Sequence, residues 1–325
     1  MDDRMLHEYR REPDPRFASD LRERLRRLER NRAFPSRRAV RIIAAAAAVA
    51  AITVVFAVPS VRVSAQAVLD VFRVKRFAAV EFKESRRDLL ESIDKERGFL
   101  VFDRQEKILD PGPPTYVASR EAAAAPAGFD VRAPRYLPPG MAADSVFVQG
   151  AGAARMAVSE EKLRSLLERL DLRDVKVPAG LDGQWVEFRK PPVVMQRFRS
   201  ERRRAMLLQA RSPEITLPAG WNLAQLGEIG LRILGLDPGD AKRIAKATDW
   251  RSTLLVPVPM NATSFRQVTV NGQSGLLIMT TGEPAADGKR RRERTILMWS
   301  TGDRIFFLQG DLDGKELIRM AESVS

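Results

Sequence analysis

The chain has 325 residues, 44% of them apolar, and a net charge of +13 at neutral pH. It has no Cys and one His, which excludes disulfides, thiol nucleophiles, metal sites built on Cys and any site with two His ligands. The apolar content is sufficient for a folded core. No base-stacking aromatic pattern, helix-turn-helix or zinc-finger spacing accompanies the positive charge, so we expect no specific binding of nucleic acid.

The first 41 residues form an Arg-rich tail, with 13 Arg against 8 acidic residues. Asp14 and Pro15 are typical of a helix start, because Asp caps the first turn and Pro fits its first position. The helix that follows has one narrow apolar stripe, made of Phe17, Leu21, Leu25 and Leu28. Such a stripe needs a partner, which we expect to be another protein, a second copy or the anionic inner leaflet; the alternative is a solvated helix that only supplies charge.

Residues 42–58 (IIAAAAAVAAITVVFAV) contain no charge, and the uncharged stretch continues to Arg62. At about 1.5 Å per residue, such a helix spans the hydrocarbon core of a bilayer. Arg37, Arg38 and Arg41 precede this stretch and favour a cytoplasmic N-terminus. We therefore predict a single transmembrane helix in a bacterial cytoplasmic membrane, with residues 59–325 outside.

Two alternatives to the membrane anchor remain open. Residues 36–38 resemble a twin-arginine signal and residues 65–67 an A-x-A cleavage site, which is the pattern of a cleaved export signal. The other alternative is a buried helix of a soluble domain, although its apolar surface would require cover on every side.

The remaining residues predict an α+β fold, in which strands with short turns form antiparallel sheet. Residues 61–80 begin as a helix and end as a strand. The residues from 110 to 128 contain several Pro and Gly, and we expect an internal linker or a long loop there. Helices are predicted over 88–93, 160–170, 223–234, 238–250 and 315–322. Strands are predicted over 77–82, 99–102, 145–149, 175–177, 185–188, 193–198, 206–209, 253–258, 265–270, 275–280, 295–300 and 304–309.

Two clusters of basic residues interrupt the predicted strands. One contains Arg202, Arg203 and Arg204; the other contains Arg290, Arg291 and Arg292. Both are expected in hairpin connections, where they could contact anionic head groups of the membrane or remain solvated and discourage edge pairing.

No motif in the chain predicts catalysis, a cofactor or a metal site. Ser159 and Lys162 have the S-x-x-K spacing of serine β-lactamases, but the companion elements are absent and Ser159 is a suitable helix cap. Asp311 and Asp313 suggest a calcium loop, although its further acidic ligands are lacking. We therefore expect a protein that is not an enzyme.

The order of tail, transmembrane helix and outer domain resembles bacterial membrane-bound anti-sigma-type regulators. The C-terminal pattern, with strands at 295–300 and 304–309 and then GKELIRMAES at 314–323, resembles DUF4367 domains and is similar to lipoprotein-sensing partners of sigma regulators. This resemblance implies a curved, half-barrel antiparallel sheet with packed helices, and a sigma factor as a cytoplasmic partner. The zinc-binding members of the regulator group carry one His and two Cys, which this chain lacks.

The sequence therefore leads to two functional hypotheses. In the first, the protein is a single-pass sensory or binding protein of the bacterial envelope, coupled to transcription through its tail. In the second, it is a carrier whose curved sheet shelters an apolar ligand, such as a lipid or lipoprotein, and which is either anchored or exported.

Overall fold

The computed structural model describes residues 74–82, 86, 89–90, 92–93, 101–218, 220–259, 263–280 and 294–325. The chain divides into two units, residues 1–47 and 48–325, and all described residues belong to the second. The predicted tail, the predicted transmembrane segment and Arg290, Arg291 and Arg292 lie outside the described residues. Within the described ranges, none of the helices has the length and apolarity that crossing a membrane requires.

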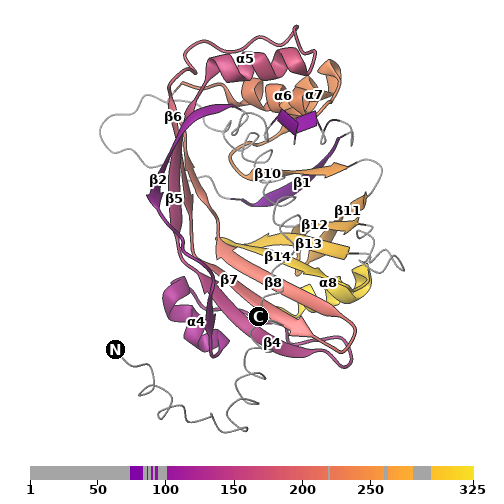
Figure 1. The fold of residues 1–325 in the computed structure, drawn as a ribbon. Helices are drawn as coiled ribbons and strands as arrows, with labels where there is room; N and C mark the ends of the chain where they lie inside the picture. Colours follow the sequence, from indigo (N-terminus) through magenta and orange to yellow (C-terminus); the bar gives the residue numbers. More distant parts are fainter. Residues whose placement is uncertain are drawn as a thin grey trace, which may run out of the picture. The chain divides into compact units, whose positions relative to one another are not determined.

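The described part of the chain is α+β, as predicted (Figure 1). Its helices are α4 (Arg120–Ala127), α5 (Glu160–Arg169), α6 (Leu223–Ile233), α7 (Pro238–Ala247) and α8 (Gly314–Glu322). Its first strands are β1 (Arg76–Phe82), β2 (Phe102–Leu109), β3 (Thr115–Val117), β4 (Ala142–Gln149), β5 (Gly152–Val158), β6 (Trp185–Lys190) and β7 (Val193–Arg199). The later strands are β8 (Arg204–Arg211), β9 (Glu214–Thr216), β10 (Thr253–Pro259), β11 (Thr263–Val270), β12 (Gln273–Thr280), β13 (Arg294–Thr301) and β14 (Arg304–Gly310).

The strands form two antiparallel sheets and one parallel pair. The larger sheet has eight strands in the order β11-β12-β13-β14-β8-β7-β4-β3, and the smaller has four in the order β2-β5-β6-β9. Strands β1 and β10 pair in parallel; β1 contacts the larger sheet at β12 and β13, and β10 contacts it at β11. The predicted antiparallel sheet is therefore confirmed, with the parallel pair as an addition that the sequence did not indicate.

The chain passes between the two sheets at a common bend. Strand β4 leads into β5 through residues 150–151, β6 leads into β7 through Pro191 and Pro192, and β8 leads into β9 through residues 212–213. Proline and glycine interrupt the strand ladder at these positions and allow it to turn. A Cβ atom on Gly152 would lie 3.1 Å from the ring of Pro111, so the connection between β2 and β3 packs closely over the bend.

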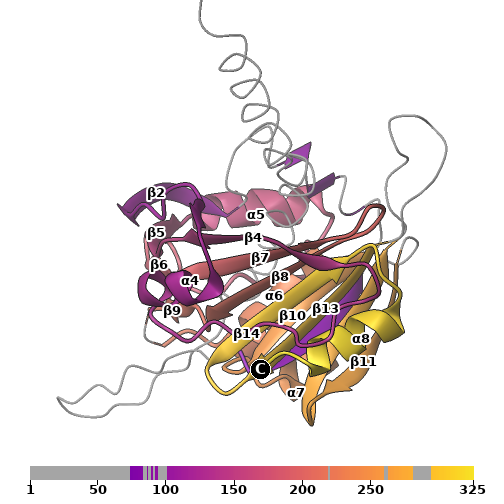
Figure 2. The same ribbon diagram turned by 90° about the horizontal axis from the view of Figure 1, so that it is seen from below.

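Helices α4 and α8 cover one face of the larger sheet (Figure 2). Leu317 and Met320 of α8 pack with Leu207, Leu297 and other buried residues of β8, β13 and β14. Helix α4 packs in the same way against Val148 and Val194. We call this the outer face of the larger sheet.

The main core lies on the opposite, inner face, where α5, α6 and β1 pack. Leu163 and Leu166 of α5 cluster with Leu226 and Ile229 of α6 and with buried residues of β1, β2, β5, β6, β9, β10 and β12. These leucines recur at helical spacing, which explains why both helices were predicted correctly. Asn222 and Ser159 cap them through their side-chain oxygens.

The prediction of a linker over 110–128 is wrong. The segment contains β3 and α4, whose N-cap is Ser119 and which ends at Gly128 in the left-handed conformation. The run of Ala residues has a high helix propensity, and Pro126 is accommodated in the last turn.

Two strand predictions also need correction, and one of the longer strands was not predicted. The strand expected at 99–102 corresponds to β2, which begins at Phe102 and continues to Leu109. Every residue of β2 after Phe102 is exposed and most are polar, so the apolar pattern did not predict this part of the strand. The expected strand over 175–177 is not a strand; β6 pairs instead with β5. Strand β5 itself was not predicted, because Gly and Ala give it little strand propensity.

Candidate functional site

The inner face of the larger sheet has an apolar row that crosses six strands. Strand pairing places one residue of each strand directly opposite the next. The members, in order from β3 to β13, are Tyr116, Phe147, Met195, Leu208, Phe307 and Met298, and we call this set the apolar row.

The apolar row is exposed at its β3 end and half-buried over the rest of its length. Tyr116 is 60% exposed, whereas Phe147, Met195 and the remaining members are half-buried. The next residue in register, Leu276 of β12, is fully buried in the main core. The row thus extends the apolar core outward along the inner face, and its outer part has no cover from another hydrophobic cluster of the described residues.

The aromatic end of the apolar row is ordered by specific ring contacts. Tyr116 and Phe147 meet edge to face with their centroids 5.9 Å apart. The guanidinium of Arg197 lies over the ring of Phe147, 4.5 Å from its centroid. Such a contact stabilises a cation whose hydration is reduced.

Two half-buried cations flank the apolar row. Burial lowers the pKa of Arg197, although the nearby Asp144 acts in the opposite direction. Burial also lowers the pKa of Lys190, whose ammonium donates a hydrogen bond to Gln149 Oε1 at 2.9 Å. Gln149 in turn donates to the carbonyl of Gly112 across the bend. Arg197 and Lys190 are therefore incompletely hydrated, and their positive charges would attract an anionic group beside the apolar row.

Two open clefts lie elsewhere, on either side of Asp249. One, of about 350 Å³, is lined by β1, the end of α7 and residues such as Gln267 and Ser274. The other, of about 460 Å³, lies beside Trp221 and Trp250. Asp249 accepts hydrogen bonds from Ser252 Oγ and from the backbone of Arg251, so its polar contacts maintain the local turn. No nucleophile and base are paired in either cleft among the lining residues.

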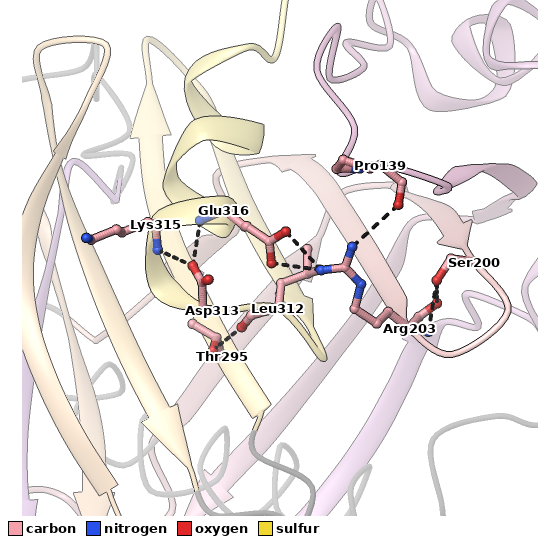
Figure 3. A network of polar contacts seen from close by, with 8 residues as sticks. All are labelled: Pro139, Ser200, Arg203, Thr295, Leu312, Asp313, Lys315 and Glu316. Carbon is pink, nitrogen blue, oxygen red and sulfur yellow. Dashed lines mark hydrogen bonds and ion pairs between the residues drawn. The ribbon is translucent and has the colours of Figure 1, made fainter.

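The structure places part of the predicted basic surface. Arg202 is exposed in the β7–β8 turn, as predicted, whereas Arg204 is exposed as the first residue of β8. Arg203 instead forms an ion pair with Glu316 of α8 and donates to the carbonyl of Pro139 (Figure 3). The predicted stripe of Phe17, Leu21, Leu25 and Leu28 and the topogenic Arg37, Arg38 and Arg41 lie outside the described residues.

Sequence reasoning missed the apolar row. Its signal was the presence of apolar residues on both faces of β7 and β8, such as Met206, Leu207 and Leu208 in succession. A strand with apolar residues on both faces needs packing partners on both faces.

Within the described ranges, no cluster of three or more potential ligands could hold a metal ion.

Comparison with known proteins gives no relative. A scan against protein-family models, a search of curated proteins and a search of solved structures found no significant match. The resemblance to membrane-bound anti-sigma-type regulators and DUF4367 domains therefore stays a prediction.

Proposed function

We propose that this protein is a membrane-anchored binding protein whose curved sheet holds an apolar ligand with an anionic group, such as a lipid. The observation that supports this proposal is the apolar row beside two partly desolvated cations, Arg197 and Lys190. Acyl chains would contact the half-buried side chains, and an acidic head group would approach the cations. Met195 and Met298 suit this use, because flexible thioether side chains adapt to ligands of different shape.

The membrane anchor is a further part of this proposal. Residues 42–58 would cross the bilayer once, and the α+β domain would lie outside the cytoplasm. Exposed Arg202 and Arg204, together with Arg290, Arg291 and Arg292, would then face anionic head groups. An alkaline phosphatase fused after Ser325 should be active, and a fluorescent protein fused there should be dark. Release of a mature chain that begins near residue 68 would support an exported carrier instead.

Coupling to transcription is the second candidate function, and it depends on the tail. Leu21→Ala combined with Leu25→Ala should abolish capture of a sigma factor while the chain still inserts into the membrane, because the topogenic arginines are unchanged. Apolar anchors of this kind typically cost about 1–3 kcal/mol of binding each when truncated. If the double variant retains the partners of the wild type, and deletion of the gene changes no sigma-dependent promoter, the regulatory function is wrong.

Ligand binding can be tested with a single introduced thiol, because the chain has no Cys. We would place the thiol at Leu208→Cys, within the apolar row, and a control thiol at Glu161→Cys, which is exposed on α5. Addition of a long-chain fatty acid to the full chain should slow labelling of the first thiol by a maleimide and leave the second unchanged. Equal labelling rates with and without the fatty acid, at both sites, would contradict the proposal.

A further inference from the structure

Strand β2 is an exposed edge of the smaller sheet. It pairs with β5 on one side, and among the described strands nothing pairs with its other side. All its residues from Asp103 to Leu109 are exposed, and Ile108 and Leu109 are each 49% exposed. An exposed edge with apolar residues is a template for pairing with another strand.

The charges across this sheet form a row that ends at the edge. Strand register aligns Glu187 of β6, Arg155 of β5 and Glu106 of β2, so that their signs alternate. Arg155 and Glu106 form an ion pair at 2.5 Å. An added strand would continue the alternation if it placed a cation opposite Glu106.

A neighbouring row ends at the edge with the opposite charge. Register aligns Trp185, Ala157 and Arg104, and the small Ala157 allows the guanidinium of Arg104 to lie over the indole, 5.3 Å from its centroid. Arg104 is the outermost residue of this row, so an added strand should place an anion opposite it.

The sequence of β2 supplies both of these charges. If two copies of β2 pair in antiparallel fashion about Gln105, Arg104 of each copy lies opposite Glu106 of the other. In the same register, Lys107 of each copy lies opposite Asp103 of the other. A pairing in which each contact occurs twice is the arrangement that a two-fold symmetric dimer requires.

We propose that this protein forms a two-fold symmetric homodimer through antiparallel pairing of strand β2 with β2 of a second copy, centred on Gln105. Two register shifts, between Phe102 and Arg104 and between Lys107 and Leu109, give β2 an extra residue at each end of its regular section. The paired segment is therefore short and the contact is reversible. The proposal does not depend on the proposed ligand.

Disulfide crosslinking of the full chain in a whole-cell extract, membranes included, tests the register. Residues opposite each other in an antiparallel pair have Cα atoms about 4.5–5.5 Å apart, within disulfide range. Gln105→Cys should therefore give a reducible dimer on mild oxidation. Lys107→Cys, two residues further on the same face, would lie about 14 Å from its equivalent and should crosslink at least about fivefold less. Absence of the first dimer, or equal yields from both variants, would overturn the proposal.

Charge exchange tests the same contact without a crosslink. Arg104→Glu brings Glu residues together, and Glu106→Arg brings Arg residues together, so each variant alone should dimerise about tenfold or more weakly. A mixture of the two variants restores both opposite-charge pairs, and tagged copies of one should capture the other. If neither variant is weakened, or the mixture stays monomeric while each variant keeps the cooperative thermal melt of the wild type, the pairing is wrong. Should either variant fail to accumulate, Asp103→Lys and Lys107→Asp provide the equivalent exchange.

Discussion

The indole ring of Trp250 lies directly against the backbone of α6 at Gly227. A Cβ atom on Gly227 would be 2.0 Å from Cζ2 of the ring, so no side chain fits at this position. The indole is fixed by its Nε1, which donates to the carbonyl of Ala245 in α7 at 2.8 Å. Gly227 therefore allows α6 to pack closely against Trp250, which follows the end of α7.

Gly227→Ala should consequently destabilise the protein by about 3 kcal/mol, because the ring cannot move without loss of its hydrogen bond. Gly239→Ala is the matched control, since a Cβ atom at this helical glycine would meet nothing within 4 Å. The control should change stability by less than about 1 kcal/mol, in the stabilising direction. Urea unfolding of the full chain in mild detergent, followed by tryptophan fluorescence, measures both; equal effects would refute the packing argument.

Arg203 and Arg202 are neighbours in the β7–β8 turn and should respond differently to charge reversal. Arg203 Nη1 donates to both carboxylate oxygens of Glu316 at 2.9 Å, and both side chains are about one-third exposed or less. Arg203→Glu would place two carboxylates together and should cost about 1–2 kcal/mol, or a few degrees in Tm.

Arg202→Glu is the control for this substitution, because Arg202 is exposed and should shift Tm by no more than about a degree. Combining Arg203→Glu with Glu316→Arg should recover part of the loss. A thermal melt in which Arg202→Glu and Arg203→Glu behave alike would contradict a structural function for this ion pair.

Leu207 and Leu208 test the assignment of the two faces of β8. Leu207 is fully buried against α8, whereas Leu208 belongs to the half-buried apolar row. Leu207→Ala should cost about 2–5 kcal/mol through lost burial and a cavity. Leu208→Ala should cost about 1 kcal/mol and affect ligand binding instead. The reverse order of stability would mean that the strand presents its faces the other way.

Acid should weaken the turn held by Asp249. The hydrogen bond from Ser252 Oγ, at 2.5 Å, is the main cause that lowers the pKa of Asp249 below its ordinary value, against the opposing effect of partial burial. Because the folded state has the lower pKa, this contribution to stability is present above the unfolded pKa of about 4 and is lost as pH falls through the folded pKa.

Asp249→Asn removes this titration and serves as the comparison. The wild type should be more stable than Asp249→Asn at pH 7, and the difference should shrink as pH falls below about 4. The midpoints of urea unfolding of both proteins, measured between pH 7 and pH 2.5, would show this change in the stability difference. A difference that stays constant over this range would exclude the proposed cause.

Much of the secondary structure could be predicted because its signals are local. Asp313 precedes the predicted helix over 315–322 and accepts hydrogen bonds from the backbone N–H groups of Lys315 and Glu316. Glu316, however, does not complete a capping box; its carboxylate binds Arg203, 113 residues earlier in the chain. The local pattern predicted the helix, whereas the tertiary structure determined that the carboxylate of Glu316 binds Arg203.

The sequence by itself determined the α+β class, the helices with regular leucine spacing and the hairpins with glycine turns, since these depend on residues a few positions apart. The tertiary structure alone decided which strands are neighbours outside these hairpins. It therefore assembled the apolar row, to which each of six strands contributes one residue, and it left β2 at an edge. A single residue per strand carries no periodic signal, and pairing between distant strands depends on the closure of long loops rather than on local propensity.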